Sequence, residues 1–205
     1  MKKDSGGMPE NIFERIAGDA EHVPRRLAKH AILWLALFGT TCAVPALAGQ
    51  DTTDNVAISM SYDVVSDGVN GASNPQAING AVVQFTVAVT GPAKGSTAAA
   101  SFAINNDIPD QMALYVGDID SSGSGPVAFI ENDSGLEFAF SGLSSADDAL
   151  EFSNNGGQTF DYIPHPDGDG FDDDVTHIRI APSGLLMPVD SHVPRFSIQY
   201  RMRIN

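Results

Sequence analysis

The sequence has little cysteine, tryptophan or positive charge, and its apolar run is short. It contains one Cys and one Trp, and 11 Lys and Arg against 26 Asp and Glu. A single cysteine cannot form a disulfide within the chain, so stability must come from a hydrophobic core. The apolar run, residues 31–38, is much shorter than the roughly 20 residues that a membrane-spanning helix needs.

The shortage of positive charge also limits the partners of the protein. The formal net charge is −15 at pH 7. A surface with this charge repels the phosphate groups of nucleic acids and of anionic lipids, so we expect binding to neither. Divalent cations and basic partners are compatible with it, and the acidity also keeps an extracellular protein in solution.

The remaining composition is typical of an all-β domain. Hydrophobic residues make up 42% of the chain and charged residues 18%, which is enough apolar material for a core and too little charge for a disordered chain. Twenty Gly and 12 Pro supply many chain reversals and disfavour long helices.

Residues 1–48 have the three parts of an export signal. Arg25, Arg26 and Lys29 precede the apolar run, and Ala46-Leu47-Ala48 follows it. A basic stretch, a short apolar helix and an A-x-A cleavage site in this order are typical of secreted proteins. We predict a signal peptide helix that is cleaved after Ala48, by the general secretory route or, through the arginine pair, by the twin-arginine route. A buried N-terminal helix is the alternative.

Cleavage would leave residues 49–205 as a single domain in the periplasm, on the cell surface or outside the cell. This mature part keeps five basic and 21 acidic residues and no cysteine, because residues 1–48 carry six basic residues, five acidic residues and Cys42. Its formal net charge is therefore −16. We expect no membrane span in it.

Apolar residues recur at every second position in the mature part, as they do in strands with one buried face. The clearest segments are residues 56–62, 83–89 and 196–204, and weaker ones are 99–104, 112–116, 127–130, 136–140, 159–163 and 175–180. About nine short strands predict an antiparallel β-sandwich with Greek-key connections, and a closed barrel is the alternative. Residues 144–150 are compatible with a helical turn or with a loop.

Several of these segments, in this order, carry a resemblance to one family. They are residues 79–87, 107–109, 151–157, Phe160, Tyr162, 169–172, 175–179 and 196–204. Over residues 54–205 the chain is similar to the conserved repeat domain of bacterial and archaeal surface proteins, known as domain of unknown function eleven. The resemblance implies an immunoglobulin-like β-sandwich in a surface protein, and it implies no activity and no catalytic residues.

Residues 165–174, His-Pro-Asp-Gly-Asp-Gly-Phe-Asp-Asp-Asp, are the most acidic segment of the chain. Asp167, Asp169 and Asp173 follow the Asp-Gly-Asp-Gly-x-x-Asp pattern of loops that wrap carboxylate oxygens around calcium. His165 and Thr176 stand where a full EF-hand-type loop has its first Asp and its bidentate Glu, so such a site would be weak and of millimolar affinity. The alternative is a solvated acidic hairpin loop. Calcium is the one cofactor that the sequence suggests.

The sequence offers no catalytic motif. His165, His177 and His192 lack the close spacing of a zinc or copper site, and the mature part has neither a cysteine nor a G-x-S-x-G nucleophile motif. His177 alternates with Ile178 and Ile180, which predicts an outward-facing side chain. We therefore expect no enzyme and name no catalytic residue.

The leading functional hypothesis is a non-enzymatic extracellular or cell-surface module, structural or adhesive, in a surface, matrix or filament assembly. In one version, residues 51–62 add as a strand to a second copy or to another surface protein. The alternative is a soluble periplasmic or secreted domain that binds carbohydrate or another ligand. The absence of tryptophan from the mature part disfavours that alternative, because aromatic side chains usually line such sites.

Overall fold

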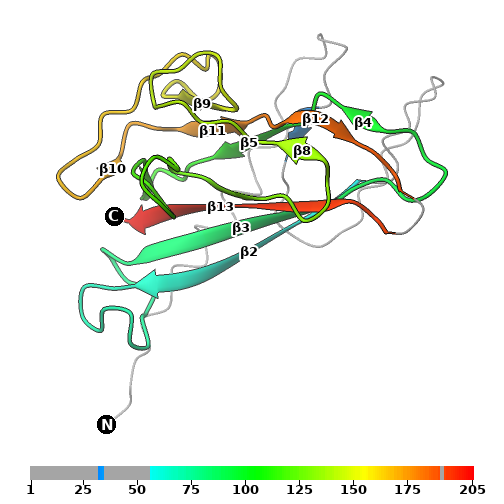
Figure 1. The fold of residues 1–205 in the computed structure, drawn as a ribbon. Coiled ribbons are helices and arrows are strands. Elements are labelled where there is room, and N and C mark those ends of the chain that lie inside the picture. Colours follow the sequence, from blue (N-terminus) through cyan, green and yellow to red (C-terminus); the bar gives the residue numbers. More distant parts are fainter. Residues whose placement is uncertain (1–31, 35–55, 190–191) are drawn as a thin grey trace.

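The computed structural model describes residues 32–34, 56–189 and 192–205. All regular elements in these residues are strands. Most strands belong to two sheets that pack face to face, with β13 and β3 in one layer and β11 and β5 in the other (Figure 1). No helix in the described part of the chain has the length and apolarity needed to cross a membrane.

The larger sheet, which we call the β13 sheet, is built around the three longest strands. Its order is β10-β6-β13-β3-β2, all neighbours are antiparallel, and β7 also pairs with β13. The strands are β2 (Ala57–Ser66), β3 (Val82–Thr90), β6 (Met112–Tyr115), β7 (Ala128–Ile130), β10 (Phe171–Asp172) and β13 (Arg195–Ile204). The sheet therefore ends at β2 on one side.

The second sheet, which we call the β11 sheet, has the order β1-β5-β11-β9. Its strands are β1 (Ile32–Trp34), β5 (Ala103–Asp107), β9 (Leu150–Ser153) and β11 (His177–Ile180). A third, small sheet joins β4 (Ala99–Ala100), β12 (Ser183–Leu186) and β8 (Leu136–Glu137) at one end of the sandwich (Figure 1).

The core lies between the two large sheets and follows the period of two in the sequence. Along β3 and β13 every second residue is buried, as the alternation predicts for residues 83–89 and 196–204. The rings of Phe85 and Tyr200, which are paired across these strands, are stacked with centroids 5.7 Å apart. Ile104, Ile178 and Phe152 complete the core from the β11 sheet.

The structure confirms that the described residues are all-β, with antiparallel pairing throughout except between β1 and β5, and it corrects several element boundaries. Residues 159–163 form only one bridge, between Tyr162 and Phe152, and the predicted strand over 136–140 pairs only at Leu136–Glu137. Residues 99–104 form two short strands, because the chain turns at Ser101 with a φ of 56°. The strands β9, β10 and β12 were not predicted.

Residues 144–149 form a loop, not a helical turn, and Leu150 is the first residue of β9. Asp148 explains this shape. Its carboxylate accepts hydrogen bonds from the backbone N–H groups of Ser141, at 2.9 Å, and Leu150, at 3.1 Å. A side chain that bonds nearby backbone donors in this way competes with helix formation.

The predicted signal peptide lies mostly outside the described residues. Ile32–Trp34, within the apolar run, form β1, which is parallel to β5 and places Leu33 opposite Ile104. These three residues are extended rather than helical, because the edge of β5 offers them unpaired backbone groups. Export and cleavage after Ala48 stay predictions.

Candidate functional site

The acidic loop over residues 165–174 is anchored first by Asp167. One oxygen of its carboxylate accepts the backbone N–H groups of Asp169 and Phe171, each at 2.9 Å. The other accepts Nη1 of Arg203 at 2.9 Å. The hydrogen bond from Phe171 and that from Arg203 lower the pKa of Asp167, so this carboxylate stays charged.

Arg203, near the end of β13, lies between two of the predicted calcium ligands. Besides its bond to Asp167, its Nη2 lies 3.8 Å from Oδ1 of Asp173, which also accepts the side-chain amide of Asn205 at 2.8 Å. The guanidinium packs over the ring of Phe171 at 4.6 Å. Arg203 thus supplies positive charge at the place where the sequence predicts a calcium ion.

Asp169 donates its backbone N–H to Asp167, and its side chain is exposed. Within the described residues, no group of three or more His, Cys, Asp or Glu side chains is arranged to hold a metal ion. Calcium binding by Asp167, Asp169 and Asp173 stays a prediction, with Arg203 as the competing cation.

We expect calcium near 1 mM to raise the melting temperature of the chain, and Arg203→Gln to strengthen the response, because the substitution removes the competing charge. Isothermal titration calorimetry and thermal unfolding, with and without chelator, measure both effects. Asp167→Asn is the matched loss-of-ligand control. No heat and no thermal shift in either the unmodified chain or Arg203→Gln would contradict the hypothesis.

Asp172, a residue that sequence reasoning did not single out, is the buried centre of this loop. It is 3% exposed. Its Oδ2 accepts the hydroxyl of Tyr162 at 3.1 Å and the backbone N–H of His165 at 2.6 Å, and its Oδ1 accepts the N–H of Asp174 at 2.8 Å. Burial and this carboxylate raise the pKa of Tyr162 to about 12. Asp172 therefore holds both ends of the loop in place.

A row of Asp107, His177 and Ser153 crosses the outer face of the β11 sheet. His177 is paired with Asp107 on β5 and with Ser153 on β9, and its Nε2 lies 2.9 Å from Oδ1 of Asp107. The outward direction predicted for His177 is confirmed, since it alternates with the fully buried Ile178 and Ile180. These are the residue types of a nucleophilic triad.

Ser153, however, is fully buried and its hydroxyl is occupied. It donates to Oδ1 of Asn155 at 2.8 Å and accepts the N–H groups of Asn155 and Gly157. Gly157 has a φ of 73°, and a Cβ there would lie 2.9 Å from the ring of His177. The row thus supports a tight turn packed over His177 and presents no accessible nucleophile.

Comparisons with protein-family models, curated proteins and solved structures found no match to this chain. Besides the acidic loop and the outer face of the β11 sheet, the edge of the β13 sheet is the third candidate for a functional site.

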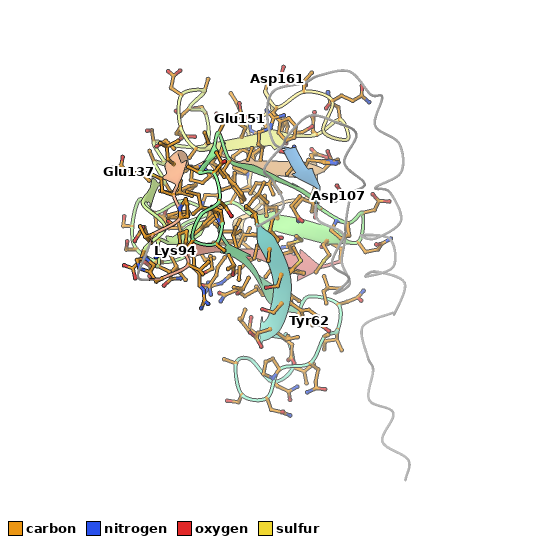
Figure 2. All side chains as sticks on the ribbon, turned by 90° about the vertical axis from the view of Figure 1, so that its right-hand side faces the viewer. Tyr62, Lys94, Asp107, Glu137, Glu151 and Asp161 are labelled. Atoms are coloured by element: carbon orange, nitrogen blue, oxygen red, sulfur yellow. The ribbon has the colours of Figure 1, made fainter. Side chains whose placement is uncertain are left out.

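β2 is a long strand whose outer edge pairs with no other strand in the described residues. It runs antiparallel to β3, with Met60 opposite Val87 and Tyr62 opposite Phe85. Residues 51–62, predicted to add to a neighbouring subunit, are thus paired within their own chain from Ala57 onward, and residues 51–55 lie outside the described part. In Figure 2, Tyr62 marks β2 near the bottom of the view, whereas Asp107 and Glu151 mark the opposite sheet.

The core-facing residues of β2 are only partly covered. Ile58, Met60 and Val64 are half-buried against the core, and Tyr62, on the same face, is 48% exposed. Their counterparts on β3 are fully buried. The β13 sheet therefore extends beyond the layer that covers it. It ends in a row of partly exposed side chains, which we call the apolar margin: Ile58, Met60, Tyr62 and Val64.

Asp67 fixes the loop that follows β2. One carboxylate oxygen accepts the N–H groups of Val69, at 2.7 Å, and Asn70, and the other accepts the N–H of Gln76 at 2.5 Å. These bonds, led by that from Asn70, lower the pKa of Asp67 from 3.8 to about 2. The end of the edge strand thus depends on a charged carboxylate.

We expect the stability of the fold to decrease as the pH falls from about 4 to about 2. The unfolded chain protonates Asp67 near its usual pKa of 3.8, and the folded chain only near 2, so the unfolded state binds more protons in this window. Hydrogen bonds lower the pKa of Asp118, Glu131 and Asp167 and act in the same direction. Urea unfolding at a series of pH values measures the slope, which Asp67→Asn should make shallower. An unchanged slope in Asp67→Asn would refute the role of this carboxylate.

Proposed function

We propose that the protein is an exported, non-enzymatic module with an immunoglobulin-like β-sandwich, which contributes to a cell-surface, matrix or filament assembly by strand addition at its open edge. The observation that carries the proposal is the outer edge of β2. Unpaired N–H and C=O groups along a strand are a template for another chain, and soluble proteins usually protect them.

Protection is largely missing on β2. Ala57–Val64 contains no proline and no lysine, and its only charge is Asp63. The first irregularity, a bulge, comes between Val64 and Ser66. By contrast, β10 at the other end of the β13 sheet has only two residues, and β9 is bridged by Tyr162. An edge that is long, regular and nearly uncharged is suited to assembly.

The loops support a structural role for a different reason. Carboxylates that could serve chemistry are instead bonded to backbone N–H groups: Asp118 to Gly123 and Gly125, at 2.9 and 2.8 Å, and Asp172 to His165 and Asp174. Acidic side chains used in this way order loops and, at the same time, keep the surface negative.

Export and assembly are tested together by expressing the full chain in a bacterium, fractionating the cells and sequencing the N-terminus of the product. We expect it outside the cytoplasm, beginning at Gly49, and self-associated in sedimentation velocity. Uncleaved protein in the cytoplasm would overturn the export part. A monomer that binds one glycan on an array would favour the ligand-binding alternative.

A further inference from the structure

The sequence of β2 is complementary to itself when two copies run antiparallel. Directly opposed residues of antiparallel strands lie on the same face of the sheet, so apolar residues must oppose apolar residues. The stretch from Val56 to Val64 has its midpoint at Met60, and its apolar and small residues alternate on both sides of that point. A pairing displaced by one residue would place Ile58 opposite Ser61 or Asp63 of the second copy and is excluded.

A two-fold axis through Met60 places compatible side chains opposite each other at every position of this stretch. It places Met60 opposite Met60 of the partner subunit and Ile58 opposite Tyr62 of the partner subunit. On the other face it places Ser59 opposite Ser61 of the partner subunit, and Asp63 opposite the small Ala57 of the partner subunit. The half-buried apolar margins of two sheets then lie side by side, and each covers part of the other.

Charge also favours this edge as the place where two copies meet. The mature part carries five basic and 21 acidic residues, so most of its surface repels a second copy. Val56–Val64 contributes one charge per chain, and this register keeps the two Asp63 side chains at opposite ends of the paired stretch. The repulsion between copies is therefore low here.

We propose that two copies of the chain join edge to edge through β2, antiparallel and about an axis at Met60, so that the two β13 sheets become one continuous sheet. The inference rests on the proposed assembly function and specifies its partner, a second copy, and its register. The contact is isologous and closes as a dimer, which can then act as the unit of a larger assembly.

The register is tested by charge pairs at positions 59 and 61, both exposed in the structure. Ser59→Lys/Ser61→Lys and Ser59→Glu/Ser61→Glu oppose like charges at two symmetric places and should raise the dimer dissociation constant at least about 10-fold. Ser59→Lys/Ser61→Glu opposes unlike charges at the same places and should retain the dimer. Sedimentation equilibrium of the full chain measures all four proteins, and circular dichroism confirms that each is folded.

The lysine pair separates a specific contact from a general charge effect. It lowers the net negative charge, so a general effect would strengthen association rather than weaken it. Retention of the dimer in all three variants would overturn the register and point to an exchanged β2 or to another surface. Dissociation of the Lys/Glu variant would place a different residue on the axis and also overturn it. A monomeric unmodified chain at all concentrations overturns the dimer, whereas the cell fractionation above decides export independently.

Discussion

Phe85→Ala should lower the free energy of unfolding by about 3–5 kcal/mol, the usual cost of removing a large aromatic side chain from a core. Phe85 is 1% exposed, lies in the middle of β3 and stacks on Tyr200 of β13. Its removal leaves a cavity between the two layers where the two longest internal strands meet. Urea denaturation followed by circular dichroism measures the change.

Tyr200→Phe is the matched control for that substitution. The Tyr200 ring is fully buried, burial raises the pKa of its hydroxyl, and within the described residues this hydroxyl has the Asn106 side chain beside it but no well-formed hydrogen bond. Removing a poorly paired buried hydroxyl and keeping the ring should change the free energy of unfolding by less than about 1 kcal/mol. Equal effects of the two substitutions would argue against a core packed around this ring pair.

Asp172→Ala should lower the free energy of unfolding by about 2–3 kcal/mol, because three hydrogen bonds to a buried carboxyl group are lost together. Tyr162→Phe removes one of the three and should cost about 1 kcal/mol. Asp173→Ala, at an exposed neighbouring carboxylate, should stay within about 0.5 kcal/mol.

Chemical denaturation of the three variants measures this order, and the result separates two accounts of the acidic loop. If Asp172 anchors the loop, its variant is the most destabilised and Asp173→Ala the least. Equal, small effects would instead fit a solvated acidic loop, and they would contradict the role of Asp172 as its anchor.

The sequence predicts the long central strands of this fold better than its short strands. Apolar residues stand at every second position of β3 and β13, as in a strand with one buried face. The structure buries these apolar residues. β10, with two residues, and β12, with four, escape prediction for lack of a pattern. Two residues show no period, and the sequence of β12, Ser-Gly-Leu-Leu, does not alternate between apolar and polar residues.

The acidic loop shows a different limit of sequence reasoning. The spacing of Asp167, Asp169 and Asp173 draws attention because it matches an ion-binding pattern, whereas the buried residue is Asp172. Arg203 could not be assigned to this loop from sequence, because 36 residues separate it from Asp167 and only the strand pairing brings them together. Likewise, Ser153, His177 and Asp107 form a row only once β9, β11 and β5 are in register.

The edge of β2 combines both kinds of information. The alternation of Val56 to Tyr62 predicts a strand, and only the sheet order shows that this strand is the last one of its sheet. The low charge of this strand is visible in the sequence, but it indicates a pairing site only for an outermost strand. Such a strand, without lysine or proline, lacks the usual protection against pairing.

Amide hydrogen exchange of residues 57–64 as a function of protein concentration tests this account most directly. Amides of β2 that point away from β3 have no partner strand among the described residues, so they should exchange rapidly in dilute protein and become protected as the concentration rises. Amides in the centre of β3 and β13 should be protected at every concentration. Exchange at β2 that is the same in dilute and concentrated protein would contradict an edge that receives a second chain.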